Sequence, residues 1–221
     1  MWRACTIYYV KSSIMLEKNI FDLSQIKGAS TLAGKFIVAS PFIGVGDIFN
    51  RALIYIADHS SKGAVGLMVN HHIYVDKVLG QNMTNILIND TNVDGEEIIL
   101  SPNMQIFLGG PLDPERGFII HSSDYKEDLL TQCDNEIAIS CSAKTLKSII
   151  TGRGPKKSLL VMGYTAWDKG QLEKEIEQNL WMLTEGDSDL IFNIRHQDKW
   201  KHALQRIGVD QSLFCGQIGH G

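Results

Sequence analysis

The 25 residues "LLVMGYTAWDKGQLEKEIEQNLWML" (159–183) carry the strongest fold signal in the chain. The apolar run at 159–162 predicts a buried strand. The next segment, "GYTAWDKG" (163–170), is interpreted as a turn, because Gly163 and Gly170 supply backbone freedom at its two ends. The charged segment that follows has the periodicity of an amphipathic helix. The stretch therefore predicts a strand, a turn and a helix in immediate succession.

The helix predicted from Gly170 has one buried face, formed by Leu172, Ile176, Leu180 and Leu183. Trp181 would project to about the opposite side of an ideal helix. Either the helix ends before Trp181 or a second surface covers this side chain. We favour a tryptophan that fills a gap in the core, because large aromatic side chains are mostly buried.

Three continuous apolar runs upstream predict strands that are covered on both faces. They are "GKFIVAS" (34–40), "RALIYIAD" (51–58) and "GAVGLMVN" (63–70). Only "HSSKG" separates the second run from the third, which is too short for a crossover helix. These two strands are therefore predicted to form an antiparallel hairpin.

A second hairpin is predicted in the middle of the chain. The strands "QIFLGG" (105–110) and "GFIIHS" (117–122) flank "PLDPER" (111–116). The two prolines and Asp113 of this connection favour a turn.

A strand, helix, strand unit follows. "EIAISC" (136–141) predicts a strand, and "SAKTLKSII" (142–150) predicts a helix capped by Ser142. With the strand at 158–163 this unit permits one parallel crossover.

The remaining segments complete the predicted organisation. "DLIFN" (189–193) predicts a strand, "DKWKHALQRIG" (198–208) a helix ended by Gly208, and "YVDKVLGQN" (74–82) a short helix. Residues 1–31 are predicted to be a peripheral N-terminal extension, and 32–221 to form one domain or a pair of small lobes. Hairpins combined with one crossover predict an α+β fold, in which helices cover a mixed β-sheet.

Composition limits the function classes. The chain has 21 Lys and Arg against 25 Asp and Glu, a formal net charge of -4 and a sequence pI of about 6.0. No global positive field attracts nucleic-acid phosphates, so specific nucleic-acid binding is not expected.

The four cysteines have irregular spacings, typical of reduced thiols in the cytosol. No apolar stretch reaches the roughly 20 residues of a membrane helix. We therefore expect a soluble, cytoplasmic protein that does not bind membranes.

Several motifs in register resemble those of one family. "GYTAWDKGQLEKEIEQNLW" (163–181) is similar to the signature of the YqgE/AlgH family, and further matches follow in the family's order. These are "GKFIVASP" with "IFNRALIYIADH", then "GAVGLMVN", "LGGPLDPERGFIIH", "KWKHALQRIGVD" and a Gly-His tail. The resemblance covers nearly everything from about residue 32 to the end.

The chain departs from the family pattern at Thr165, at "VGD" (45–47), at "NHH" (70–72) and at its Gly-His-Gly end. The resemblance implies a compact two-part YqgE/AlgH-like α+β fold. Members are described as uncharacterised proteins or proposed transcriptional regulators. No established reaction or cofactor is implied.

The glycine-rich loop at 109–117 is the first candidate binding site. Gly109 and Gly110 allow a ligand to approach the backbone, and Arg116 offers a planar fork for a carboxylate or phosphate. A tight connection would need the same glycines, so the sequence supports a structural and a binding role equally.

Tyr164 and Trp167 also allow two interpretations. They either plug the edge of the sheet, which we favour, or form one wall of a pocket at a strand end. If the strand before Tyr164 meets the strand after Arg116, the aromatic side chains and Arg116 would frame one shallow concavity. We take this concavity as the predicted recognition site.

No catalytic residue, metal site or cofactor is predicted. Cys141 lies where the predicted strand meets the predicted helix, so the helix dipole would favour a thiolate, and His121 would act as its base if the two strands neighbour each other. We expect an inert thiol, because the sequence shows neither the proximity nor the third residue that an activated thiol needs. The histidines near strand ends, His59, His71, His72 and His121, form no pair with metal-site spacing.

These observations favour a non-enzymatic regulatory or adaptor protein that binds a small ligand or a protein partner. A DNA-binding transcriptional regulator is the first alternative, for which "GRGPKK" (152–157) with Lys144 and Lys147 supplies the one local basic run. A cysteine-dependent or anion-handling enzyme is the second alternative. The sequence leaves the ligand and the oligomeric state open.

Overall fold

A computed structural model describes residues 32–73, 105–132 and 136–209 of the 221-residue chain. The extension predicted at 1–31 and the short helix predicted at 74–82 lie outside these ranges. None of the helices in the described ranges is long and apolar enough to span a bilayer.

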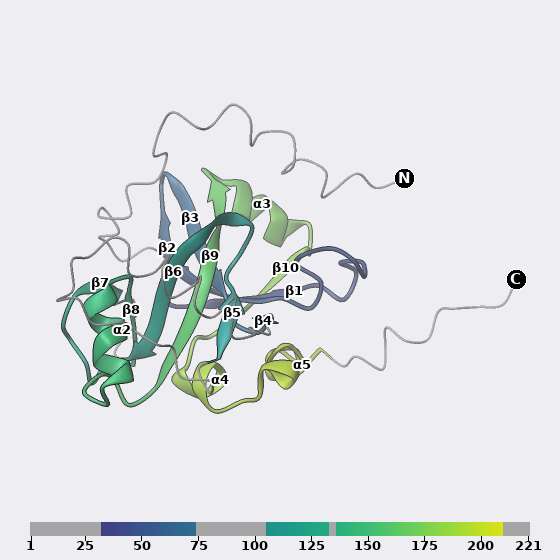
Figure 1. The fold of residues 1–221 in the computed structure, drawn as a ribbon. Helices are drawn as coiled ribbons and strands as arrows, with labels where there is room; N and C mark the ends of the chain where they lie inside the picture. The colour runs from purple at the N-terminus through teal and green to yellow at the C-terminus, as the bar shows by residue number, and fades with distance from the viewer. Residues whose placement is uncertain (1–31, 74–104, 133–135, 210–221) are drawn as a thin grey trace, which may run out of the picture.

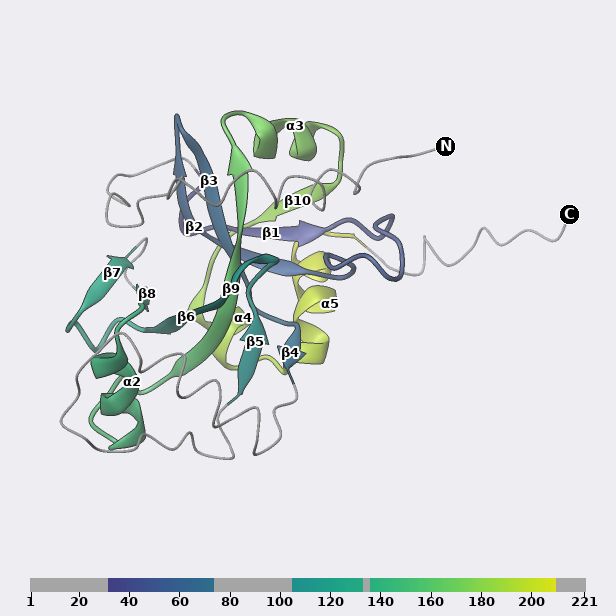
Figure 2. The same ribbon diagram turned by 45° about the horizontal axis from the view of Figure 1, so that its top comes forward.

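The strands form one curled sheet in the order β10-β1-β2-β3-β9-β6-β8-β7, with β5 beside β9 and β4 beside β5 (Figures 1 and 2). The strand pairs are antiparallel except for β5 and β9. In chain order the elements are β1 (Phe36–Ala39), β2 (Leu53–Ser60), β3 (Gly63–Met68), β4 (His72–Ile73), β5 (Ile106–Leu108), β6 (Leu112–Ser122), β7 (Leu129–Gln132), β8 (Ile137–Ser140), α2 (Ala143–Ile150), β9 (Ser158–Asp168), α3 (Gln171–Glu177), β10 (Trp181–Thr184), α4 (Ser188–Phe192) and α5 (His196–Arg206).

The helices are few and lie at separate places on the curled sheet. Helix α5 packs on β1 and β2, and α3 packs on β3, β9 and β10. Helix α2 lies beside β7 and β8 in Figures 1 and 2. The fold is therefore a curled, largely antiparallel sheet with sparse helices, and one parallel pair makes the sheet mixed.

Two hydrophobic clusters fill the interior. The larger includes fully buried side chains of β1, β2, β3 and β5, among them Phe36, Leu53, Tyr55, Leu67 and Phe107. The smaller lies under α2 and contains Ile106, Ile119, Leu146, Leu160 and Met162. Both clusters receive side chains from β5, β6 and β9, so these three strands connect the two.

The first hairpin and the crossover are confirmed. β2 pairs with β3 in an antiparallel register from Ile54 opposite Met68 to Ser60 opposite Gly63. β8 and β9 both pair antiparallel with β6, so they run parallel to each other on its two sides. The connecting helix α2 begins as predicted, because Ser142 Oγ accepts a hydrogen bond from the backbone N–H of Lys144 at 3.1 Å.

The second predicted hairpin is wrong, because β9 lies between β5 and β6. Phe107 of β5 is opposite Val161 in a parallel pair, and Phe118 of β6 is opposite the same residue in an antiparallel pair. Of the segment predicted as a turn at 111–116, all but Pro111 belongs to β6, with an irregular register between Leu112 and Gly117. The short connection between β5 and β6 suggested that these two strands pair with each other. Instead, both pair with β9, which lies some 50 residues further along the chain.

The turn predicted at 163–170 is also wrong, because β9 continues to Asp168. Gly163 has a φ of 72°, a left-handed conformation that glycine adopts readily. The glycine suggested a turn in the sequence because this conformation is common in turns. Beyond it, Thr165 is opposite Gly66 and Trp167 is opposite Ala64. Pairing with β3 satisfies the backbone groups and keeps this segment extended.

The segment at 189–193 was predicted to be a strand but lies in helix α4. Asp187 is the N-cap, and its Oδ1 accepts a hydrogen bond from the backbone N–H of Leu190 at 2.7 Å. The apolar run "LIF" resembles a strand in the sequence. The Asp187 cap before this run stabilises the helix instead.

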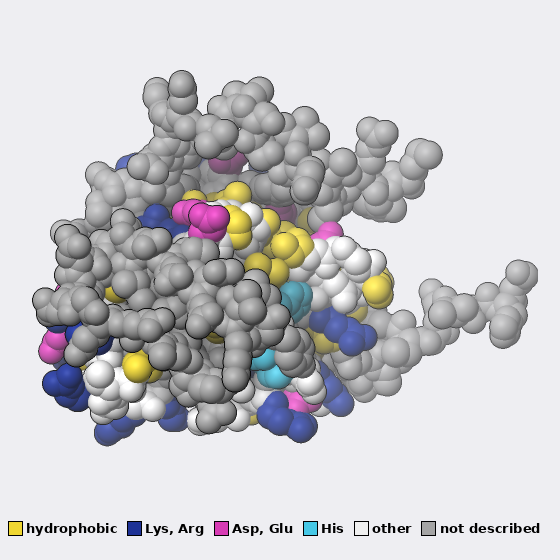
Figure 3. All heavy atoms as spheres, in the orientation of Figure 1, with side chains coloured by type: hydrophobic (Ala, Val, Ile, Leu, Met, Phe, Trp, Pro, Cys, Tyr) yellow, Lys and Arg dark blue, Asp and Glu magenta, His cyan; other side chains and the backbone are white. Residues whose placement is uncertain are grey.

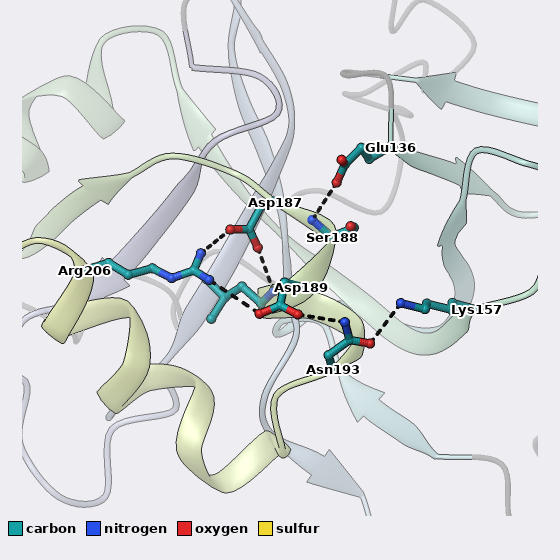
Figure 4. A network of polar contacts seen from close by, with 8 residues as sticks. Glu136, Lys157, Asp187, Ser188, Asp189, Asn193 and Arg206 are labelled. Carbon is teal, nitrogen blue, oxygen red and sulfur yellow. Dashed lines mark hydrogen bonds and ion pairs between the residues drawn. The ribbon is translucent and has the colours of Figure 1, made fainter.

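Side chains from distant elements hold α4 in place (Figure 4). Arg206 of α5 contacts Asp187 and lies 3.8 Å from Asp189. Asn193 donates to Asp189 at 2.7 Å and accepts from Lys157 Nζ at 2.9 Å. The network therefore joins α4 both to α5 and to the start of β9.

Helix α3 forms a corner that we call the α3 corner, made of Trp167, Gln171, Glu175 and Trp181. The indole N–H groups of Trp167 and Trp181 both donate to Glu175 Oε2, each at 2.8 Å. Gln171 Nε2 donates to Glu175 Oε1 at 2.9 Å, and the two indole rings pack edge to face with centroids 6.1 Å apart. One carboxylate thus joins β9, α3 and β10.

The α3 corner decides between the alternatives for Trp181. The helix ends at Glu177, and Trp181 begins β10 with 4% of its surface exposed, as the core-filling interpretation predicted. The predicted helical face is wrong beyond Ile176, because Leu180 follows the helix and Leu183, in β10, is 37% exposed.

Candidate functional site

Gly109 and Gly110 pack directly against β9. A Cβ on Gly109 would lie 2.2 Å from the carbonyl oxygen of Gly163, and a Cβ on Gly110 would lie 2.3 Å from the backbone of Tyr164. Gly109 also donates its N–H to Met162 O at 2.7 Å and accepts from Met68 N at 2.9 Å. The space beside these glycines is occupied by backbone, which supports their structural role.

Arg116 and Tyr164 are brought together through Phe118. The Arg116 guanidinium lies 5.5 Å from the centre of the Phe118 ring, which packs edge to face on Tyr164 at 6.1 Å. Burial raises the pKa of Tyr164; nearby Asp113 adds to this and Arg116 opposes it. These two side chains therefore share one environment at the junction of β6 and β9.

Trp167 does not join that group. It is three residues after Tyr164 in β9, and successive side chains of a strand point to opposite faces. Its ring is 3% exposed and packs in the α3 corner. The structure therefore places Arg116 and Tyr164 together against Phe118 and places Trp167 in the α3 corner instead.

His121 lies away from both, near the other end of β6. It is fully buried, and its two ring nitrogens contact Ser122 O and Ser140 Oγ, each at 2.9 Å. Burial lowers the pKa of His121. Cys141 follows Ser140 and is exposed. The imidazole is thus engaged by serine groups on both sides, and Ser140 is its side-chain neighbour on β8.

The residues that the structure describes contain no cluster of three or more His, Cys, Asp and Glu side chains placed to hold a metal ion. A hollow beside α2, lined by Cys141, Leu146 and Leu160 among others, measures about 10 Å³. An open groove of about 450 Å³ lies between β10 and the end of α5. Its rim carries the Lys35–Glu185 and Arg206–Asp187 ion pairs.

The connection between β1 and β2 exposes three large apolar side chains. Phe42 is 77% exposed, Val45 98% and Ile48 38%. We call residues 41–50 the apolar loop. Single exposed apolar residues are common on protein surfaces, but three within seven positions make this loop a candidate interaction site.

The apolar loop is held in shape at its base. Asp47 Oδ1 accepts from Phe49 N at 2.8 Å, and Asn50 Nδ2 donates to Ile43 O at 2.6 Å. The Phe49 ring packs edge to face on Trp181 at 5.6 Å. A loop anchored in this way presents its exposed side chains on a fixed base.

One histidine contacts the end of the apolar loop and two more stack on each other next to it in the sequence or the fold; we call His71, His72 and His196 the histidine cluster. His71 Nε2 is 3.0 Å from Asn50 O, at the end of the loop. The rings of His72 in β4 and His196 in α5 stack with centroids 4.9 Å apart. All three are half-buried. Figure 3 shows histidine side chains at the surface next to this loop, with Lys and Arg side chains close by.

A buried lysine lies behind the histidine cluster. Lys199 is 2% exposed, and its ammonium donates to Val69 O at 3.0 Å and Ile191 O at 2.6 Å. It also lies 5.3 Å from the centre of the Phe107 ring. Burial lowers the pKa of Lys199 to about 8. The amine is thus satisfied by two carbonyl groups and an aromatic face.

Neither the apolar loop nor the histidine cluster was predicted from the sequence. A signal was present in "PFIGVGDIF" (41–49), where apolar side chains are interspersed with glycines and do not follow a helix or strand period. His72 and His196 are 124 positions apart in the sequence, so only the fold brings them together.

Residues 36–212 match the family described as AlgH-like. The chain belongs to the AlgH-like family. A relative from Rickettsia canadensis named a UPF0301 protein is 37% identical over 190 residues, which cover 86% of this chain and 95% of the relative. A relative of the same name from Rickettsia akari has the same identity and coverage.

Solved structures agree with this assignment. The AlgH-like chain is similar to the solution structure of the AlgH protein from Pseudomonas aeruginosa, with a TM-score of 0.65 and 30% identity over 88% of this chain and all of that one. A crystal structure of a protein from Corynebacterium diphtheriae, at 18% identity and a TM-score of 0.58, shares the fold. The family resemblance identified from the motifs is confirmed. The names of these relatives and structures state no activity.

Proposed function

We propose that this AlgH-like protein is a cytoplasmic regulatory or adaptor protein without catalytic activity, and that it binds a protein partner through the apolar loop. The observation that carries the proposal is the exposure of Phe42, Val45 and Ile48 on one anchored loop. Binding of a partner that removes such apolar groups from water lowers the free energy of the system.

The two hollows described above favour a protein over a small ligand, the first because of its size and the second because of its openness. Pockets for drug-sized ligands have volumes of roughly 300 Å³ or more and bury most of the ligand. The hollow beside α2 holds about one water molecule at 10 Å³. The larger groove is open to solvent, and ion pairs already occupy its rim.

The basic run at 152–157 gives the DNA-binding alternative little support. Lys144 on the preceding helix lies 3.4 Å from Glu127 and 3.6 Å from Asp128. Lys157 donates to Asn193 in the network around α4. Positive charges with such neighbours have less to offer a phosphate backbone.

Site-specific photo-crosslinking in cells tests the proposal. A photoreactive amino acid at Val45 is expected to give a discrete product with one partner protein, and the product should disappear when Phe42→Ser is added. The same group at Lys62, exposed in the β2–β3 turn, is the matched control.

The crosslinked protein is then purified and bound to the wild type and to Phe42→Ser in vitro. Tight binding to the wild type alone supports the proposal. Equal products from both positions, or a product of two copies of this chain, would overturn it.

A further inference from the structure

The apolar loop and the histidine cluster form one continuous surface. Asn50 ends the loop and its carbonyl oxygen contacts His71. Asn70, the residue before His71, donates to Arg51 O at 2.8 Å, and the exposed Arg51 guanidinium lies 5.5 Å from the Trp200 ring of α5. A partner that covers the loop therefore also reaches His71 and Arg51.

This surface has positive charge on the side of the histidine cluster. Arg51 is exposed, and the ammonium of Lys199 lies beneath, on carbonyl groups that carry no formal charge. In the part of the chain that the structure describes, the carboxylates of Asp198 and Asp47 each have another partner as well. Asp198 contacts Arg195 at 2.7 and 2.9 Å, and Asp47 accepts from the backbone of the loop.

We infer that the histidine cluster, together with Arg51, is a subsite for a carboxylate of the partner, so that the partner segment combines apolar side chains with an Asp or Glu. This inference rests on the proposed function and deepens it. Charge complementarity selects this occupant, because a basic partner segment would place like charges beside Arg51 and Lys199.

The protonation of the cluster follows from the same geometry. Burial lowers the pKa of His196, and the neighbouring His72 and Lys199 lower it further, while Asp198 raises it. Burial also lowers the pKa of His71, although contacts with Asn50 and Arg51 oppose this. A carboxylate that arrives beside these rings favours their charged forms. Binding therefore takes up protons and strengthens as the pH falls.

Selection from a phage-displayed library of random dodecapeptides tests the subsite without a known partner. The full-length wild type is the target, and Phe42→Ser is the counter-target. We expect loop-dependent peptides to contain apolar residues next to Asp or Glu. Their affinity should rise several-fold from pH 7.5 to 5.5, whereas versions with Asn and Gln in place of Asp and Glu should show no such rise.

Two variants of the same helix isolate the subsite. His196→Gln should weaken the acidic peptides roughly fivefold, the scale of a partly exposed charge pair. His202→Gln, an exposed histidine of α5, should leave the affinity unchanged. A readout at pH 7.5 and 5.5 separates charge from packing, because lost packing would weaken binding equally at both.

Failure of each proposal has its own signature. Loop-dependent peptides that lack acidic residues, or that bind His196→Gln as well as the wild type, would overturn the subsite and leave the proposed function standing. If no enriched peptide depends on Phe42, the proposed function fails as well. Sedimentation of the protein alone is the remaining measurement, and self-association that Phe42→Ser abolishes would assign the surface to a second copy.

Discussion

The α3 corner and the apolar loop are both rich in large apolar side chains, yet they place them differently. In the corner, Trp167 and Trp181 are buried and their N–H groups share the Glu175 carboxylate. In the loop, Phe42 and Val45 face solvent. Phe49 packs on Trp181, so the two regions are in contact.

The difference separates a region that stabilises the fold, the α3 corner, from the region proposed to bind a partner, the apolar loop. Buried indoles that donate to a carboxylate stabilise the fold through packing and charge-assisted hydrogen bonds. Exposed apolar side chains contribute little to folding and remain available for a partner. The family signature motif at 163–181 thus describes architecture. The proposed recognition site lies in another segment, where "VGD" (45–47) departs from the family pattern.

The comparison predicts its largest effect in the corner. Trp167→Ala should lower the free energy of unfolding by about 3 to 5 kcal/mol, because it opens a cavity and removes one donor from Glu175. Chemical denaturation monitored by circular dichroism measures this. A loss below about 1 kcal/mol, within the range of ordinary substitutions, would show that the corner is not a centre of stability.

Two glycines, one packed against β9 and one in the apolar loop, sharpen the contrast. Gly110→Ala should cost about 2 to 3 kcal/mol, since its Cβ would meet the Tyr164 backbone at 2.3 Å. Gly44→Ala in the apolar loop is the control, because no atom lies within 4 Å of its added Cβ. Unfolding curves of both variants measure the difference. Similar stabilities would contradict the structural role assigned to Gly110.

Lys199 provides a pH-dependent contrast to Glu175. Its pKa is about 8 in the folded protein and near 10.5 when unperturbed. Between these values the unfolded chain binds a proton that the folded protein does not, so stability rises with pH. Relative to Lys199→Met, the wild type should gain about 2 kcal/mol between pH 7.5 and 9.5. Denaturation at both values tests this, and parallel profiles would refute the buried, deprotonating amine.

The smallest effect on folding is expected in the apolar loop. Val45→Ser should change the free energy of unfolding by less than about 0.5 kcal/mol, because Val45 is 98% exposed. The same variant should weaken binding to the crosslinked partner. Differential scanning calorimetry and a binding titration provide the pair of measurements. A large loss of stability would mean that the loop packs against something in solution.

Much of the local structure was predictable, because its signals are local. The continuous apolar runs identified β1, β2 and β3, Ser142 identified the start of α2, and the short "HSSKG" connection identified the hairpin. The resemblance of motifs identified the family. Each of these signals lies within a few residues of the structure that it determines.

Pairings between distant segments were not predictable from such signals. The position of β9 between β5 and β6 depends on contacts some 50 residues apart, and the extended conformation after Gly163 depends on β3. The α4 helix depends on its Asp187 cap and on Arg206. Of the side chains predicted to frame one concavity, Arg116 and Tyr164 both lie against Phe118, while Trp167 packs in the α3 corner. The apolar loop and the histidine cluster were not predicted, because only the fold brings their residues together.

The late position of β9 in the chain has a consequence for synthesis on the ribosome. β3 pairs with β2 on one side and with β9 on the other. It ends at Met68, whereas the ribosome completes β9 only at Asp168. At about 5 to 20 residues per second, the emerging β2–β3 hairpin waits roughly 5 to 20 s with one edge open. An open apolar edge is a site for aggregation or chaperone capture. Codons that slow translation between these positions are therefore expected to lower the soluble yield.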